Sequence, residues 1–250
     1  MTTKTQDAWQ PAPARPSLTE GEVHVWRVSL EQTPEVYEAL WQTLSSDERA
    51  RAERFRFEKD RTRFVVARGA LRSILSRYVG LHPARLSFAY GAQGKPELAG
   101  LTTHSTLRFN LSHAGAAALC AVTEGREIGV DVEFIREDFA SMEIAERFFS
   151  PREVAALQEL PQQARTRAFF NCWTRKEAYI KALGEGLSCP LDSFAVSLAE
   201  EDAATLLWSA AGAGEVERWT MKSLAVGADY AAAVAVEGKA EPFRLWLWQS

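Results

Sequence analysis

The chain has 250 residues and a net charge of −4; 46% of its residues are hydrophobic and 25% are charged. Such a chain forms a globular protein of one large domain or two smaller ones, and its overall acidity argues against nucleic acid as a partner. No apolar run reaches about 18 residues, and the first residues lack the apolar core of a signal peptide, so we expect a cytoplasmic protein without a membrane segment. Its three cysteines, Cys120, Cys172 and Cys189, have neither zinc-site nor redox-pair spacing and are expected to be reduced.

Hydrophobic periodicity predicts the elements of the first half. Residues 1–20, which contain many Pro and Ala residues, are expected to form a flexible leader. Alternation predicts a strand over 22–30, and helical spacing predicts helices over 33–44, 45–55 and 60–80. A short strand over 85–90, a glycine-rich turn, and two strands over 107–115 and 116–123 complete this half.

The second half repeats this order loosely. A strand over 127–135 precedes helices over 141–149, 150–160 and 169–187, with Ser150 as N-cap and Pro151 at the first helical position. Strands are predicted over 193–198, 218–226 and 229–238, with an edge strand over 243–250. We infer an α+β fold of two similar halves, 21–125 and 126–250, each a long helix packed on an antiparallel sheet.

The strand over 127–135, "EIGVDVEFI", places two carboxylates on one face. A period of two puts Asp131 and Glu133 side by side, with their Cα atoms roughly 6–7 Å apart. Two parallel carboxylates at this spacing repel each other unless a cation lies between them. The alternative is a pair of exposed acids on the solvent face of a sheet.

The helix over 169–187, "FFNCWTRKEAYIKALGEGL", carries a carboxylate among its aromatic residues. Its inward stripe is formed by Phe170, Trp173, Glu177, Ile180 and Gly184. A buried, unpaired Glu177 is costly, so a partner is required. Lys181, one turn later, offers an intrahelical pair. The alternative is a metal shared with Asp131 and Glu133; three carboxylates with phosphate oxygens suit Mg²⁺ and the chemistry of phosphoryl transfer.

Basic residues gather in the first half. Residues 49–77 hold ten basic and three acidic side chains. Such a stretch is suited to a polyanionic small ligand, although a solvated Arg-rich helix face gives the same pattern.

Four segments together resemble the 4′-phosphopantetheinyl transferases. "IGVDVE" (128–133) and "WTRKEAYIKALGEGL" (173–187) are similar to the signature pair of this family, and "GKP" (94–96) with "FNLSHAG" (109–115) narrows the resemblance to the two-halved, monomeric Sfp-type branch. The basic segment 48–64 resembles the CoA-facing region of this branch. The resemblance extends from about residue 22 to 236, with the motifs in the expected order.

This resemblance implies an enzyme that moves the phosphopantetheine arm of coenzyme A to a serine of an apo acyl, peptidyl or aryl carrier protein. Adenosine 3′,5′-bisphosphate is released, and Mg²⁺ is required. Fatty acid, polyketide and nonribosomal peptide synthesis all use such carriers, and the sequence does not choose among them. Because both halves lie in one chain, a monomer is expected.

The resemblance also implies roles for individual residues. Asp131, Glu133 and Glu177 would bind Mg²⁺. Glu177 would also activate the carrier serine, directly or through water, and Lys181 would steady the pyrophosphate. Contacts to CoA are expected from Arg51, Gly94, Lys95, Asn110, Ser112, His113, Lys176 and Lys181, with Arg63 and Arg68 as weaker candidates.

Two positions depart from the family pattern, and one segment is a candidate docking surface. Glu48 stands where some members carry a lysine, and Phe64 where some carry a hydroxyl residue, which puts individual nucleotide contacts in doubt. Residues 135–150, a mixed apolar and charged segment, lie where the family docks its carrier protein. A catalytically silent CoA- or carrier-binding module and a Mg²⁺-dependent phosphohydrolase are the competing functions; the presence of all three carboxylates disfavours the first, and the extent of the motif match disfavours the second.

Overall fold

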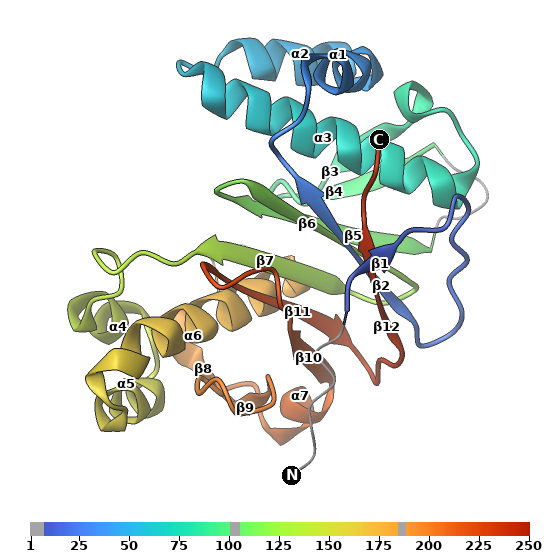
Figure 1. Ribbon diagram of the computed structural model, residues 1–250. Helices are drawn as coiled ribbons and strands as arrows, with labels where there is room; N and C mark the ends of the chain where they lie inside the picture. The colour runs from blue at the N-terminus through green and yellow to red at the C-terminus, as the bar shows by residue number, and fades with distance from the viewer. Residues whose placement is uncertain (1–7, 101–105, 185–188) are drawn as a thin grey trace.

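The computed structural model describes residues 8–100, 106–184 and 189–250, and it has the expected α+β architecture. One sheet has five strands in the order β1-β12-β2-β6-β5, and a second has three in the order β10-β11-β7 (Figure 1). The first comprises β1 (Gln10–Pro11), β12 (Phe243–Leu247), β2 (Val23–Ser29), β6 (Ala117–Glu124) and β5 (Leu107–Ala114). The second comprises β10 (Trp219–Ser223), β11 (Tyr230–Glu237) and β7 (Ile128–Phe134).

Each sheet carries one long helix, so the expected repeat of two similar halves is confirmed. Helix α3 (Glu58–Val79) covers the first sheet and α6 (Gln162–Leu183) the second. Both helices have 22 residues and end at a glycine in the left-handed conformation, Gly80 at φ 69° and Gly184 at φ 73°. Helix α6 begins earlier than residue 169, the start predicted from its aromatic run.

Three apolar cores stack through the molecule. One lies between α3 and the first sheet and includes Trp26 and Leu71, and another lies between α6 and the second sheet and includes Phe169 and Ala233. The third joins the inner faces of the two sheets, where Leu119 meets strands β7 and β11. The result is a helix–sheet–sheet–helix stack whose two halves meet along β5 and β7 (Figure 1).

Smaller elements flank the two long helices. Helices α1 (Pro34–Thr43) and α2 (Ser46–Glu53) lie on α3, whereas α4 (Met142–Phe148) and α5 (Pro151–Glu159) lie beside α6. Two hairpins, β3 (Ser87–Tyr90) with β4 (Pro96–Ala99) and β8 (Phe194–Val196) with β9 (Leu206–Ser209), complete the fold together with α7 (Ala213–Glu217). None of the helices in the described ranges is both long and apolar enough to cross a bilayer.

Both ends of the described chain join the first sheet. Strand β12 lies between β1 and β2 and is parallel to both, so it is not an edge strand as predicted, and it returns from the second half to the sheet of the first. The leader is also anchored where the structure describes it: Gln10–Pro11 pair with β12, and Trp9 Nε1 donates to Ala225 O over 2.6 Å. These contacts anchor the leader at residues 9–11, where a flexible segment was expected, and residues 1–7 lie outside the described residues.

Candidate active site

Gly129 allows strand β7 to lie directly on the backbone of α6. A Cβ atom at Gly129 would be 2.1 Å from Ala178 O and 2.4 Å from Ala182 N, so no other residue fits without moving the helix. This close approach brings Asp131, two residues along β7, next to the last turns of α6 where Glu177 and Lys181 lie.

Asp131 is the centre of the cluster. Its side chain is 2% exposed, and its Oδ1 accepts hydrogen bonds from Lys181 Nζ at 2.5 Å and Ser112 Oγ at 2.8 Å. Lys181 Nζ also donates to Ser112 Oγ over 3.1 Å. The three side chains come from β7, α6 and β5, so the cluster is assembled where the two halves meet. Asp131 Oδ2 is buried and has no hydrogen-bond partner, a costly state for a carboxylate oxygen.

Three acidic groups influence one another at this point. Burial and the charge of Asp131 raise the pKa of Glu133 to about 7. The same two causes raise the pKa of Glu177. Burial lowers the pKa of Lys181, but the charges of Asp131, Glu177 and Glu133 outweigh it, so the net shift is upward. The site therefore holds more negative charge than its one lysine balances.

The chemistry of these donors fits a hard divalent cation. Oxygen ligands are what Mg²⁺ prefers, Asp131 Oδ2 has no partner, and burial together with repulsion by Asp131 raises the pKa values of the two glutamates. Within the described residues, however, no three acidic, histidine or cysteine side chains are grouped tightly enough to form a metal site. The carboxylates are near one another without forming a closed cage, and Lys181 provides the positive charge at Asp131.

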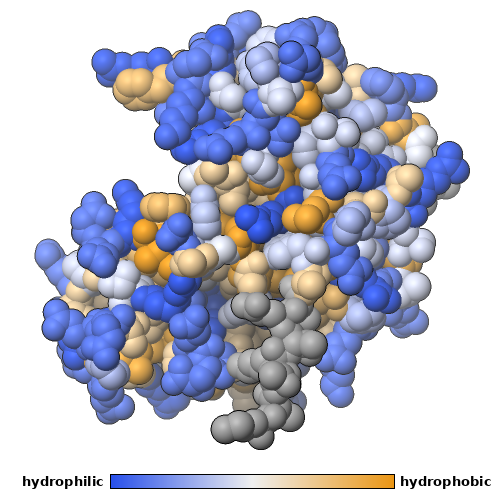
Figure 2. Space-filling view, in the orientation of Figure 1, coloured by the Kyte–Doolittle hydropathy of each residue, from blue (hydrophilic) through white to orange (hydrophobic). Residues whose placement is uncertain are grey.

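Cationic side chains surround His113, at the exposed end of β5. Burial by the surrounding protein lowers its pKa, and the positive charges of Lys181, Arg63 and Arg51 lower it further. These three cations come from α6, α3 and α2. Figure 2 shows a hollow between the part of the molecule that contains α1–α3 and the part that contains α4–α6, which we call the cleft between the halves. The three positive charges that act on His113 make the potential around it positive, which favours an anionic ligand.

A second group of the expected CoA residues is engaged in contacts within the protein. Lys95 Nζ donates to Glu127 Oε2 at 2.8 Å and to Ala182 O at 3.0 Å, so it closes the end of α6. Gly94 lies exposed in the turn before it, at φ 78°. Asn110 Oδ1 accepts from Val130 N at 3.0 Å, which links β5 to β7 across the two sheets. Ser112 faces Asp131, as described above.

Lys176 does not belong to the site. It is 1% exposed, and its Nζ donates to Leu191 O and Phe194 O, both at 2.7 Å, and pairs with Glu153 Oε2 at 2.8 Å. A phosphate cannot reach an ammonium group that is buried among these partners, so the expected CoA contact is wrong. Glu153, which sequence reasoning missed, is the N3 residue of the capping box at the start of α5. The sequence signal was a glutamate three residues after the predicted N-cap, Ser150, which is the pattern of a capping box.

Glu48 is the buried counter-ion of α3. It is 3% exposed and accepts from Arg68 Nε at 2.5 Å and from Arg72 Nε at 2.6 Å. Arg68 also donates to Tyr90 OH, so its charge is already paired. The two arginines, four residues apart on a buried helix face, were the sequence signal that an acid must lie opposite them. The neighbouring hollow of about 260 Å³ includes Arg51 and Phe64 in its lining.

Comparisons with known proteins identify the family to which the chain belongs. The model of the 4′-phosphopantetheinyl transferase superfamily matches residues 127–235, and the model of the 4′-phosphopantetheinyl transferase N-terminal region matches 26–125. The 4′-phosphopantetheinyl transferase HetI of Nostoc sp. strain PCC 7120 is 41% identical over 241 residues, which are 96% of this chain and 98% of that protein. The chain belongs to the 4′-phosphopantetheinyl transferase superfamily.

Other relatives place this superfamily member in the Sfp-type branch, as the resemblance implied. The 4′-phosphopantetheinyl transferase Sfp of Bacillus subtilis strain 168 is 35% identical over 158 residues, which are 63% of this chain and 68% of that protein. Among solved structures, the ACPS–CoA complex of Chronobacterium ammoniagenes matches 47% of this chain and 100% of its own, with 22% identity and a TM-score of 0.35.

Proposed function

We propose that this superfamily member transfers the 4′-phosphopantetheine arm of coenzyme A to a serine hydroxyl of an apo carrier protein. The observation that carries the proposal is the cluster at the junction of the halves. There, Asp131 presents a partnerless Oδ2 beside Glu133 and Glu177, while Lys181 and the cations around His113 face the same cleft. Acidic groups for a metal and basic groups for phosphates thus lie side by side, as pyrophosphate chemistry requires.

The reaction needs a proton acceptor, charge stabilisation and alignment. The serine oxygen of the carrier attacks the phosphorus that bears the pantetheine arm. The P–O bond to the other phosphate breaks, and adenosine 3′,5′-bisphosphate leaves with the bonding electrons. Glu177, whose pKa is raised, accepts the serine proton directly or through a water molecule. Lys181 contributes positive charge that stabilises the charge developing on the pyrophosphate.

Mg²⁺ would be held by Asp131, Glu133 and Glu177, and when bound it would neutralise the pyrophosphate. In this proposal the role of Lys181 at Asp131 is to hold that carboxylate in place through a 2.5 Å contact. Ser112 holds the same oxygen from the other half, at 2.8 Å. Asp131 is thereby fixed by both halves of the chain, which leaves its second oxygen directed to the ligand.

The nucleotide end of CoA is proposed to lie along the cationic wall of the cleft. His113, Arg51 and Arg63 supply this wall, with Lys95 and Gly94 at its β3–β4 side and Asn110 behind it. The 3′-phosphate and the pyrophosphate are the groups that these cations would contact.

The carrier protein is proposed to dock on residues 135–150. In this segment Phe139, Met142 and Ile144 pack partly buried on the α6 core, and Phe134, which precedes the segment in the chain, is exposed. Since both halves of the site come from one chain, we expect a monomer. The three free cysteines favour the reducing cytoplasm as its compartment.

Asp131→Asn tests this assignment, because it keeps the shape and the Ser112 contact while removing the charge. We expect carrier modification to fall at least about 100-fold, with CoA binding measured by calorimetry largely retained. Wild-type turnover in this variant would overturn the role of the cluster. Weak turnover by both proteins, with CoA bound, would favour the silent binding module.

A further inference from the structure

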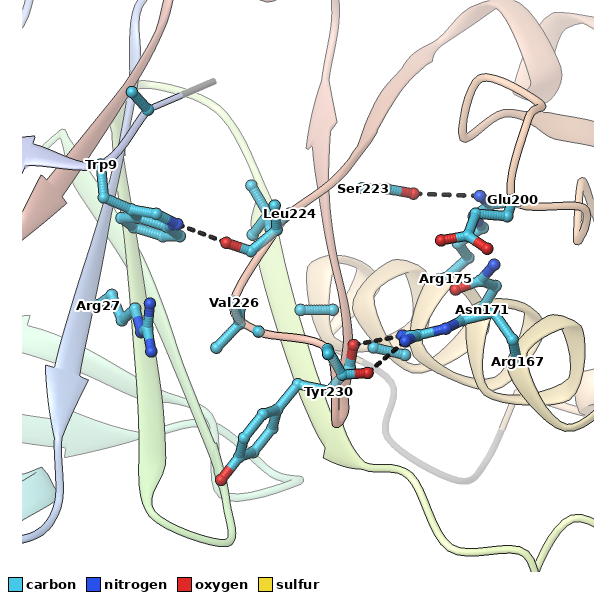
Figure 3. Close-up of a pocket in the computed structure, with 16 residues that line it drawn as sticks. Trp9, Arg27, Arg167, Asn171, Arg175, Glu200, Ser223, Leu224, Val226 and Tyr230 are labelled. Carbon is cyan, nitrogen blue, oxygen red and sulfur yellow. Dashed lines mark hydrogen bonds between the residues drawn. The ribbon is translucent and has the colours of Figure 1, made fainter. Parts of the chain in front are cut away.

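A cavity of about 710 Å³ lies on another part of the molecule, and none of its lining residues belongs to the candidate active site. It opens between the anchored leader, strand β2, the loop after β10 and the first half of α6 (Figure 3). Trp9 and Arg27 line it from the first half of the fold. Arg167 and Arg175 line it from α6, and Tyr230 lies between these two sides.

Positive charge dominates the lining. Three arginines line the cavity, and Glu200 is the one carboxylate among its described lining residues. Arg27 is half-buried, and its guanidinium makes no hydrogen bond or ion pair with any residue that the structure describes. An arginine without a counter-ion in a concave, partly desolvated position favours an anion.

Arg175 adds a buried positive charge to the wall of the cavity. It is 1% exposed, and its terminal nitrogens donate to Ser197 Oγ at 3.0 Å and Ser223 Oγ at 3.1 Å, which are neutral partners. Its Nε is buried and has no hydrogen-bond partner. This buried charge has no acidic hydrogen-bond partner in the described part of the chain, so it adds to the positive potential of the cavity without itself contacting a ligand.

Apolar side chains form another part of the wall, which hydrogen bonds hold in place. Trp9 is fixed by its 2.6 Å hydrogen bond to Ala225 O, and Arg167 fixes the loop through a 2.6 Å hydrogen bond to Tyr230 O. Leu224 and Val226 supply aliphatic surface. A ligand that fits these walls therefore has a flat apolar body in addition to its charge.

We propose that this cavity is a second ligand site, which binds a small aryl phosphate or aryl carboxylate with its anion at Arg27 and its ring between Trp9 and the aliphatic wall. The site is independent of the proposed transferase reaction.

Phenyl phosphate is the probe. Its binding to the full chain is measured by calorimetry with a chelator and saturating CoA present, so that the cleft between the halves is occupied. We expect it to bind at least about tenfold more tightly than inorganic phosphate, because the ring adds apolar contact. Arg27→Gln should weaken binding about tenfold or more, whereas Arg27→Lys should retain most of it.

Arg85→Gln is the matched control. It removes one positive charge from an exposed site outside the cavity and should leave the affinity for phenyl phosphate unchanged. A crystal of the wild-type protein soaked in phenyl phosphate should show the ligand beside Arg27. The proposal would be overturned by any of three results: equal affinity of Arg27→Gln and wild type for phenyl phosphate, an absence of saturable binding, or a ligand found only in the cleft between the halves.

Discussion

Gly129→Ala is the perturbation whose effect the structure fixes most closely. The new methyl group would lie 2.1 Å from Ala178 O, 2.4 Å from Ala182 N and 2.9 Å from Lys181 C. All three are backbone atoms of one helix, so no side-chain rotation relieves the overlap. Strand β7 and helix α6 must separate by about 1 Å or more to restore ordinary contact.

Two consequences follow from this separation. Overpacking against side chains costs about 1–3 kcal/mol, and overlap with backbone belongs at or above the upper end, so we expect the free energy of unfolding to fall by about 3 kcal/mol. The same movement carries Lys181 and Glu177 away from Asp131. Because a misplacement of about 1 Å in a catalytic group costs roughly 100-fold in rate, the folded fraction should transfer phosphopantetheine about 100 times more slowly.

Urea denaturation, monitored by tryptophan fluorescence, measures the free energy of unfolding. Single-turnover modification of a carrier protein, at urea concentrations below the unfolding transition, measures the transfer rate of the folded protein. Gly214→Ala is the control: it lies in α7 with no atom within 4 Å of the added Cβ, so stability and rate should hold or rise slightly. If Gly129→Ala unfolds at the wild-type urea concentration and turns over at the wild-type rate, the close packing of β7 on α6 is refuted.

Three further substitutions test separate features. Lys176→Met leaves the Glu153 carboxylate buried without its cationic partner, so the free energy of unfolding should fall by about 3 kcal/mol in urea denaturation. The KM for CoA should stay constant. A raised KM at an unchanged free energy of unfolding would restore Lys176 as a phosphate contact. Lys181→Gln should lower kcat about 100-fold in a carrier-modification assay, and an unchanged kcat would exclude it from the reaction. Burial raises the pKa of Glu22, but hydrogen bonds from Arg244 and Thr19 outweigh it and lower the pKa from 4.5 to about 2. This carboxylate therefore stabilises the fold above pH 4.5 and progressively less as the pH falls toward 2. Glu22→Gln should lower the free energy of unfolding by about 1–2 kcal/mol at pH 7 and make it depend less on pH between the two pKa values. If plots of the free energy of unfolding against pH are parallel for wild type and variant, the shift in the pKa of Glu22 is contradicted.

The sequence predicted those features that short-range periodicity encodes. Alternation over 127–135 predicted the strand that carries Asp131 and Glu133 on one face, and helical spacing predicted that Glu177 and Lys181 lie one turn apart on α6. The family resemblance, carried by motifs in order, was confirmed by the family models and by a relative that matches over nearly the full length.

The features that the sequence did not predict depend on contacts between distant residues. Lys176 was expected at the phosphates from the family resemblance; its burial depends on Glu153, 23 positions earlier, and on two carbonyl groups of the following segment. Strand β12 pairs in parallel with β2, more than 200 residues away, and no turn signal reports such a pairing. The anchored leader is likewise defined only by its partner β12.

Intact mass spectrometry of an apo carrier protein incubated with this protein, CoA and Mg²⁺ tests the central claim most directly. We expect the carrier to gain one phosphopantetheine group, and we expect a chelator or the Asp131→Asn substitution to abolish the gain. The proposed transfer would be contradicted if acyl, peptidyl and aryl carriers all stayed unmodified while the folded protein still bound CoA. Cleavage of CoA without carrier modification would indicate a hydrolase.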